Sequence, residues 1–353
     1  MSGGLEGVVV ADTVLSLLDP PNGRLWVRGV ALPELVARYG YEGTVALLWD
    51  GFAGEGLTRA SLQATLGAAR QAAFARLDAW LPVAAARPLE TAVRLGLAML
   101  PDDSAAPDIA ATLAVGVPAL LRRAAGEAVL PPDPSLPVAA DLLRMLHGVV
   151  PGPAAARALD TYFTVMADSG MSASSFAARV VASTRASVAC AVLGAWCAFT
   201  GPIHGGAPGP TLDLLDALAA TDDIDAWIEG KLRSGERLMG FGHRVYRGND
   251  PRAAAMRVAL QDMGPAVGRL AFADTVEARV AAVVDRVKPG RKLPANVEIM
   301  AALLLDAVGI PREAFTAVFA VGRCASWIAH ALEQQKTGRM FRPEARYVGP
   351  AVG

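Results

Sequence analysis

The chain has 353 residues, of which 53% are hydrophobic and 19% are charged, and its formal net charge is −1. This composition is typical of a densely packed globular protein and excludes a disordered one. The balanced charge gives no overall attraction to nucleic acid or to a membrane surface. The length is sufficient for two domains.

Neither a membrane span nor a secretion signal is predicted. The longest apolar runs, such as residues 188–199, fall well short of the roughly 20 residues that a span needs. The N-terminus has no basic segment followed by an apolar one. The three cysteines, Cys190, Cys197 and Cys324, lie in apolar helical patterns, so we expect small buried side chains in a reducing, cytoplasmic compartment. No metal-binding spacing accompanies them, and no metal site is predicted.

The first thirty residues favour a short β-hairpin, and the rest favours helices. The β-formers are residues 8–10 and 25–27, with the turn sequence Pro-Pro-Asn-Gly at 20–23 between them. Apolar residues then recur at helical spacing over 33–48, 59–81, 88–99 and 109–129. Segments rich in Pro and Asp separate these runs and are predicted to be loops.

The densest group of polar residues is RLMGFGHRVYRGNDPR at positions 237–252. Gly240 and Gly242 allow the backbone to approach a ligand and present His243 on a turn. Arginines follow, which can bind carboxylate or phosphate, and a new helix is predicted to begin at Pro251. A solvated loop with a hydrogen-bonded histidine explains this stretch alone about equally well.

Three further positions combine polar chemistry with apolar surroundings. His204 follows an apolar helix within GPIHGGA, where it either caps that helix or faces a ligand. Glu298 opens an apolar helix, where it complements the helix dipole or, facing a cleft, has its pKa raised toward that of a general base. Arg323 lies in an apolar helix with Trp327 and requires a carboxylate partner from the protein or a ligand.

Taken together, these motifs resemble the citrate synthase family, of the shorter bacterial and archaeal kind that includes 2-methylcitrate synthases. The resemblance covers nearly the whole chain in one order: GLEGVVVADT at 4, FAARVVAST at 176, GPIHGGA at 201, MGFGHRVYRGNDPRA at 239, NVE at 296 and RPEARYVGP at 342. Several long motifs in the same order are a specific signal.

The resemblance implies a mainly α fold with a short N-terminal β-hairpin. A large helical domain would comprise residues 1–205 and 310–353, and a smaller helical domain residues 206–309. The domains would close over a cleft, and the chain would form a homodimer. The implied reaction condenses acetyl-CoA with oxaloacetate or a related 2-oxo dicarboxylic acid and hydrolyses the thioester to citrate and CoA. Acetyl-CoA is a substrate, and no cofactor is expected.

The family's residue roles carry over onto matching positions. Glu298 would be the base that deprotonates the thioester methyl group, His204 would stabilise the enolate, and His243 would polarise the acceptor ketone. The substrate carboxylates would meet Arg252, Arg323 and, from the other subunit, Arg342. Ser169 would line the same pocket. CoA would contact Arg247, Gly240 and Gly242.

The chain departs from the family pattern at several of these positions. Glu298 stands where the family most often has aspartate, and Met166 and Ser169 stand where it has histidines. Pro208 follows HGGA in place of asparagine. A second hypothesis therefore stays open, in which the chain is a catalytically weak or inactive paralogue that binds CoA or another ligand, or acts as a regulatory subunit.

Overall fold

The computed structural model describes residues 4–5, 7–206, 208–242, 250–264 and 267–350. The predicted site residues His243 and Arg247 lie outside these ranges. The main helices are α1 Leu32–Glu34, α2 Gly40–Trp49, α3 Arg59–Ala75, α4 Leu81–Ala84, α5 Leu89–Ala98, α6 Ala106–Ala124, α7 Val138–His147, α8 Pro153–Met166, α9 Ala173–Ser183, α10 Val188–Phe199, α11 Pro208–Ala219, α12 Ile224–Arg233, α13 Pro251–Asp262, α14 Val267–Val287, α15 Val297–Ala307 and α16 Phe315–Thr337. Short helices are η1 Pro20–Asn22, η2 Leu35–Tyr39, η3 Leu77–Ala79 and η4 Arg312–Ala314. The mainly α fold is confirmed.

A small antiparallel sheet of β1 Ser16–Asp19, β2 Arg24–Val27 and β3 Val30–Ala31 forms near the N-terminus. The predicted turn and second strand are confirmed, but the predicted strand at residues 8–10 is wrong, because β1 begins at Ser16, eight residues after the predicted start. Val8 and Val9 are exposed and form no part of the sheet. The Val14 N–H instead donates to the Glu333 carboxylate at 2.8 Å, which ties this segment to α16.

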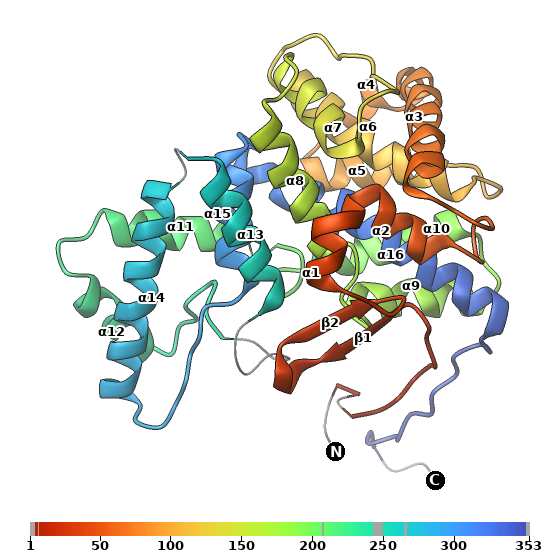
Figure 1. Ribbon diagram of the computed structural model, residues 1–353. Helices are drawn as coiled ribbons and strands as arrows, with labels where there is room; N and C mark the ends of the chain where they lie inside the picture. The colour runs from red at the N-terminus through yellow and green to blue at the C-terminus, as the bar shows by residue number, and fades with distance from the viewer. Residues whose placement is uncertain (1–3, 6, 207, 243–249, 265–266, 351–353) are drawn as a thin grey trace.

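Helix α16 runs through the middle of the larger helical group and packs against α6, α8, α9 and α10 (Figure 1). The stretch Arg312–Thr337 is long and apolar enough to cross a membrane, yet 89% of its most apolar part is buried inside the fold. That burial is the pattern of a core helix. Polar side chains on α16 therefore face neighbouring helices, which is where the site is built.

Helices α11 to α15 form a second group to one side of the first (Figure 1). Within it, α12 packs on α14, and α11 and α13 pack on α15. Helices α13 and α15 also contact α8 of the larger group. The two groups therefore meet at α8, α13 and α15.

Helix α10 shows that the prediction for two of the cysteines is wrong. Cys190 and Cys197 are exposed, and Cys324 alone of the three is buried. Both exposed thiols lie on one side of α10, because its other side buries larger residues such as Trp196 and Phe199.

Candidate active site

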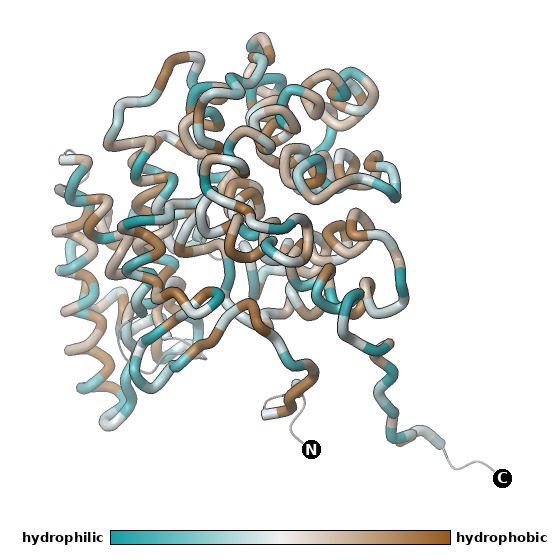
Figure 2. Tube along the Cα trace, turned by 45° about the vertical axis from the view of Figure 1, so that its right-hand side comes forward, coloured by the Kyte–Doolittle hydropathy of each residue, from teal (hydrophilic) through white to brown (hydrophobic). Residues whose placement is uncertain are grey.

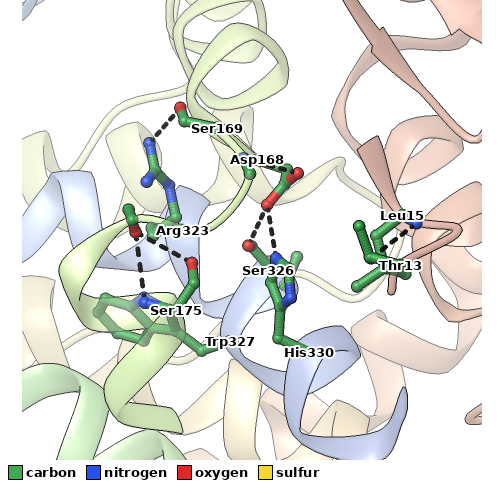
Figure 3. Close-up of polar contacts among 12 residues, drawn as sticks. Thr13, Leu15, Asp168, Ser169, Ser175, Arg323, Ser326, Trp327 and His330 are labelled. Carbon is green, nitrogen blue, oxygen red and sulfur yellow. Dashed lines mark hydrogen bonds and ion pairs between the residues drawn. The ribbon is translucent and has the colours of Figure 1, made fainter. Parts of the chain in front are cut away.

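The loop between α8 and α9 brings Ser169 against two arginines that are distant in sequence, of which Figure 3 shows Arg323. Its Oγ accepts a hydrogen bond from Arg323 Nη2 at 3.0 Å and another from Arg252 Nη1 at 3.1 Å. A hydroxyl oxygen has two acceptor sites, and both are used here. The Ser169 proton must therefore point away from both guanidinium groups, where it can be donated to a ligand oxygen.

Asp168, the neighbour of Ser169 in this loop, anchors the loop to α16 through hydrogen bonds. Its buried carboxylate accepts hydrogen bonds from the Ser326 hydroxyl, from the Gly170 N–H at 3.2 Å and from His330 Nε2 at 3.3 Å (Figure 3). Burial alone would raise the pKa of Asp168, but the hydrogen bond from His330, together with the one from Ser326, lowers it well below its usual range. His330 Nδ1 in turn accepts from Arg179 Nε at 2.8 Å. The position of Ser169 thus depends on a buried polar network.

Arg252 lies in the first turn of α13, which begins at Pro251 as predicted. The Asp250 carboxylate caps the helix and holds the Arg252 guanidinium through Nε at 3.0 Å and Nη2 at 2.7 Å. The side chain is buried. Such a two-point pair fixes the plane of the guanidinium and leaves Nη1 directed at Ser169.

Arg323 is a buried cation without a counter-ion in the described part of the chain. It is 2% exposed, its Nε donates to the Met166 carbonyl at 2.6 Å, and its guanidinium lies 5.0 Å from the Phe319 ring centre. No described carboxylate comes within 4.0 Å of it. Burial lowers the pKa of Arg323 to about 10 against the opposing charge of Asp168, so the guanidinium stays charged at neutral pH. Of the two predicted kinds of partner, a protein carboxylate is not found among the described residues.

Glu298 lies in the first turn of α15, and the residues just before this turn form hydrogen bonds with the backbone at Gly240 and Gly242. Asn296 caps the helix, and its N–H and side chain donate to the carbonyls of Gly240 and Gly242 at 2.8 and 2.9 Å. Both glycines have left-handed backbones, with φ of 82° and 81°. A Cβ on Gly240 would lie 2.7 Å from Ile299. The two glycines thus allow the chain to pack closely beside the helix turn that carries Glu298.

The environment of the Glu298 carboxyl group matches the prediction of a raised pKa. Burial raises the pKa of Glu298 to about 7, with Asp250 adding to the effect and Arg252 opposing it. Its Oε2 atom is buried and has no hydrogen-bond partner among the described residues. A carboxyl group with a pKa near neutrality is suited to take a proton from a weak carbon acid.

His204 is held as a neutral imidazole with one defined tautomer. Its Nε2 accepts from the Ser174 N–H at 3.3 Å and contacts the Ser174 hydroxyl at 2.8 Å. The backbone N–H can only donate, so Nε2 carries no proton and the Ser174 hydroxyl, which itself accepts from Trp327 Nε1 at 3.0 Å, donates to the same nitrogen. Burial lowers the pKa of His204 to about 4, with Arg323 contributing. The ring proton therefore resides on Nδ1, which can donate to a developing oxyanion.

His204 and Glu298 line one cleft of about 840 Å³. The cleft lies between the turn after α10 and the group α11 to α15, and Gly240, Phe241 and Gly242 form part of its wall. Three cations also line it: Arg237, Lys288 and Arg291. A volume of this size with basic walls suits a large ligand that carries phosphate groups.

The structure brings most of the predicted residues together but leaves Arg342 apart. Arg342 is exposed in the C-terminal tail, which Figure 2 shows as mainly hydrophilic. Sequence reasoning missed Ser174, whose N–H and hydroxyl both contact His204 Nε2. The available signal was the serine run at residues 172–175, immediately after the loop that carries Ser169.

The comparisons with known proteins agree across the whole chain. The family profile described as "Citrate synthase, C-terminal domain" matches residues 4–344. A Mycobacterium tuberculosis protein provisionally named citrate synthase 2 is 37% identical over 358 residues, covering 98% of this chain and 92% of the relative. The crystal structure of citrate synthase from Thermotoga maritima has a TM-score of 0.85 at 28% identity, covering 99% and 96% of the two chains.

A second solved structure, at 22% identity, supports the fold alone. It is the ternary complex of carboxymethyl coenzyme A and oxaloacetate with citrate synthase from Thermoplasma acidophilum, with a TM-score of 0.84 over 100% of this chain and 98% of that one. The fold and the site together define a helical condensing enzyme of the acyltransferase class. The chain belongs to the citrate synthase family, as the sequence motifs predicted.

Proposed function

We propose that this chain condenses acetyl-CoA with oxaloacetate and hydrolyses the thioester, releasing citrate and CoA. The observation that carries the proposal is the pair of groups in one cleft, a Glu298 carboxyl group with a pKa of about 7 and a neutral His204. A thioester methyl group is a very weak acid. Its deprotonation requires both a matched base and a donor for the enolate oxygen.

In the proposed reaction, Glu298 removes a methyl proton and His204 Nδ1–H donates to the enolate oxygen. The enolate carbon then attacks the ketone carbon of oxaloacetate, whose oxygen receives a proton from His243. Water cleaves the resulting thioester. The substrate carboxylates would bind Arg252 and Arg323, beside the Ser169 hydroxyl. No cofactor other than the substrate acetyl-CoA is required.

The remaining expectations are proposals of the same kind. Gly240, Gly242 and Arg247 would contact CoA, with the basic residues of the cleft meeting its phosphates. Residues 206–309 would close as a small domain on residues 1–205 and 310–353. We place the enzyme in the cytoplasm.

A homodimer would supply Arg342 from the second subunit. Helix α10 supports a dimer, because its sequence VACAVLGAWCAF is apolar on every side while one side is exposed in the single chain. A helix that is hydrophobic all round is normally buried.

The test is release of CoA thiol from acetyl-CoA with a panel of 2-oxo acids, oxaloacetate first. We expect release that requires a 2-oxo acid and disappears in Glu298→Gln and His243→Ala. The double variant Ser169→His with Glu298→Asp restores the family residues at these two positions. Lower turnover in this variant than in the parent would show that the substitutions suit this chain's own acceptor. No release by the parent with any pair, while acetyl-CoA still binds, would instead establish the paralogue hypothesis, which the site geometry does not favour.

A further inference from the structure

Tyr162 is a buried polar residue with no role in the proposed condensation. It lies on α8, four residues before that helix ends, and its side chain is 0% exposed. Its hydroxyl has no hydrogen-bond partner among the described residues. A buried hydroxyl without a partner costs free energy, so its retention requires an explanation.

The surroundings of Tyr162 belong to the proposed active site. Helix α8 packs against α15, which carries Glu298, and against α16, which carries Arg323. The Tyr162 ring meets the Phe319 ring edge-on at 6.1 Å, and the same Phe319 ring lies beneath the Arg323 guanidinium. Tyr162 therefore shares the environment of the buried cation.

The electrostatic environment of the Tyr162 hydroxyl includes both Glu298 and Arg323. Burial raises the pKa of Tyr162 well above its ordinary value, the charge of Glu298 raises it further, and the charge of Arg323 opposes the shift. The hydroxyl therefore stays protonated at every working pH and can act as a donor.

A second buried atom without a partner lies in the same region. Glu298 Oε2 has no hydrogen bond to any described residue, and Arg323 has no described carboxylate within ion-pair distance. An unpaired donor beside a buried cation without a described counter-ion is an arrangement that binds a polar anion. A bound 2-oxo acid supplies both the negative charge and the oxygen acceptors.

We propose that the Tyr162 hydroxyl donates a hydrogen bond to an oxygen of the bound 2-oxo acid, and so helps to determine acceptor specificity in this chain. The inference rests on the proposed function, since it concerns the acceptor of that reaction. It also fits the departures from the family pattern. Met166 and Ser169 stand where the family motif has histidines, and Tyr162 adds a donor from the helix that leads into this loop.

The test is Tyr162→Phe, which removes the oxygen and keeps the ring. We expect oxaloacetate to bind about tenfold more weakly by titration calorimetry, with its KM raised to match, because a hydrogen bond to a charged ligand is lost. The KM for acetyl-CoA should stay unchanged. The melting temperature of the unliganded variant should equal or exceed that of the parent, because the hydroxyl has no protein partner to lose.

Tyr41→Phe is a matched control. Tyr41 is also buried and packs against an aromatic ring, but its hydroxyl donates to the Val321 carbonyl at 2.9 Å. Its loss should lower the melting temperature and leave oxaloacetate affinity unchanged. The pair of variants thus separates a hydroxyl kept for a ligand from one kept for the fold.

Two results would overturn the inference. One is an oxaloacetate affinity in Tyr162→Phe equal to that of the parent. The other is a loss of thermal stability as large as that of Tyr41→Phe, which would mean that the Tyr162 hydroxyl serves the fold. Binding is measured without turnover, so a parent that binds oxaloacetate but releases no thiol would refute only the proposed function. A parent that binds no 2-oxo acid would refute both.

Discussion

The ionisation of Glu298 should control the rate of the reaction between pH 5 and pH 8. Its pKa of about 7 means that only a minor fraction is ionised at pH 6. Because the base must be ionised, kcat/KM for acetyl-CoA should fall about tenfold for each pH unit below 7 and level off above it. His204, with a pKa of about 4, stays neutral over this range and adds no second step.

The same pKa has a consequence for stability, whose sign is fixed by linkage. The folded state holds the Glu298 proton more tightly than the unfolded chain does, since the pKa rises from 4.5 to about 7 on folding. The contribution of Glu298 to the free energy of unfolding is therefore fully present below pH 4.5. It is lost as the pH rises to 7, which lowers the stability by up to about 3 kcal/mol. Glu298→Gln cannot ionise and escapes this loss.

The assay compares parent and Glu298→Gln in thiol release and in denaturant unfolding at pH 4.5, 6 and 8. We expect the variant to be almost inactive at every pH, yet more stable than the parent at pH 8 and equal to it at pH 4.5. A group that is needed for activity but lowers the stability of the folded state is typical of active sites. A flat rate profile between pH 5 and pH 8, or a variant no more stable at pH 8, would refute the assignment of Glu298 as a buried base.

Two further substitutions test how His204 is held. Ser174→Ala removes the hydroxyl that joins His204 to Trp327, so kcat should fall about tenfold while the KM for oxaloacetate holds. Unchanged kcat would mean that the Ser174 backbone N–H, which the variant keeps, is sufficient to hold His204. Gly205→Ala places a Cβ 2.5 Å from the buried Phe199 ring, which contacts the His204 ring. Both kcat and the free energy of unfolding should therefore fall, the latter by about 1–3 kcal/mol, with a lower unfolding midpoint. A variant with the midpoint of the parent would show that the ring can move without cost.

Residues with local sequence signals were predictable. Glu298 opens an apolar helix, and an apolar setting raises the pKa of a carboxyl group wherever it is buried. The start of α13 at Pro251 follows from proline's preference for the first helical turn. The burial of Arg323 follows from its place in an apolar helix, while its carboxylate partner stays a prediction.

Features that depend on tertiary packing were not predictable. Tyr162 occupies an ordinary core position of an amphipathic helix, and only the packing of α8 on α15 and α16 leaves its hydroxyl without a protein partner. The residues at 8–10 have strong β-propensity but find no neighbouring strand, whereas β1 pairs along its length with β2. Cys190 and Cys197 follow an apolar pattern that an isolated chain does not bury.

Those two exposed thiols have a practical consequence for any assay that detects free CoA with an aromatic disulfide reagent. Cys190 and Cys197 can react with the same reagent, whereas Cys324 is enclosed. A blank recorded without acetyl-CoA would therefore titrate two equivalents per polypeptide if α10 is bare, and almost none if a second copy covers it. The number of thiols that react in this blank would thus show whether the chain is a monomer or a dimer before any substrate is added.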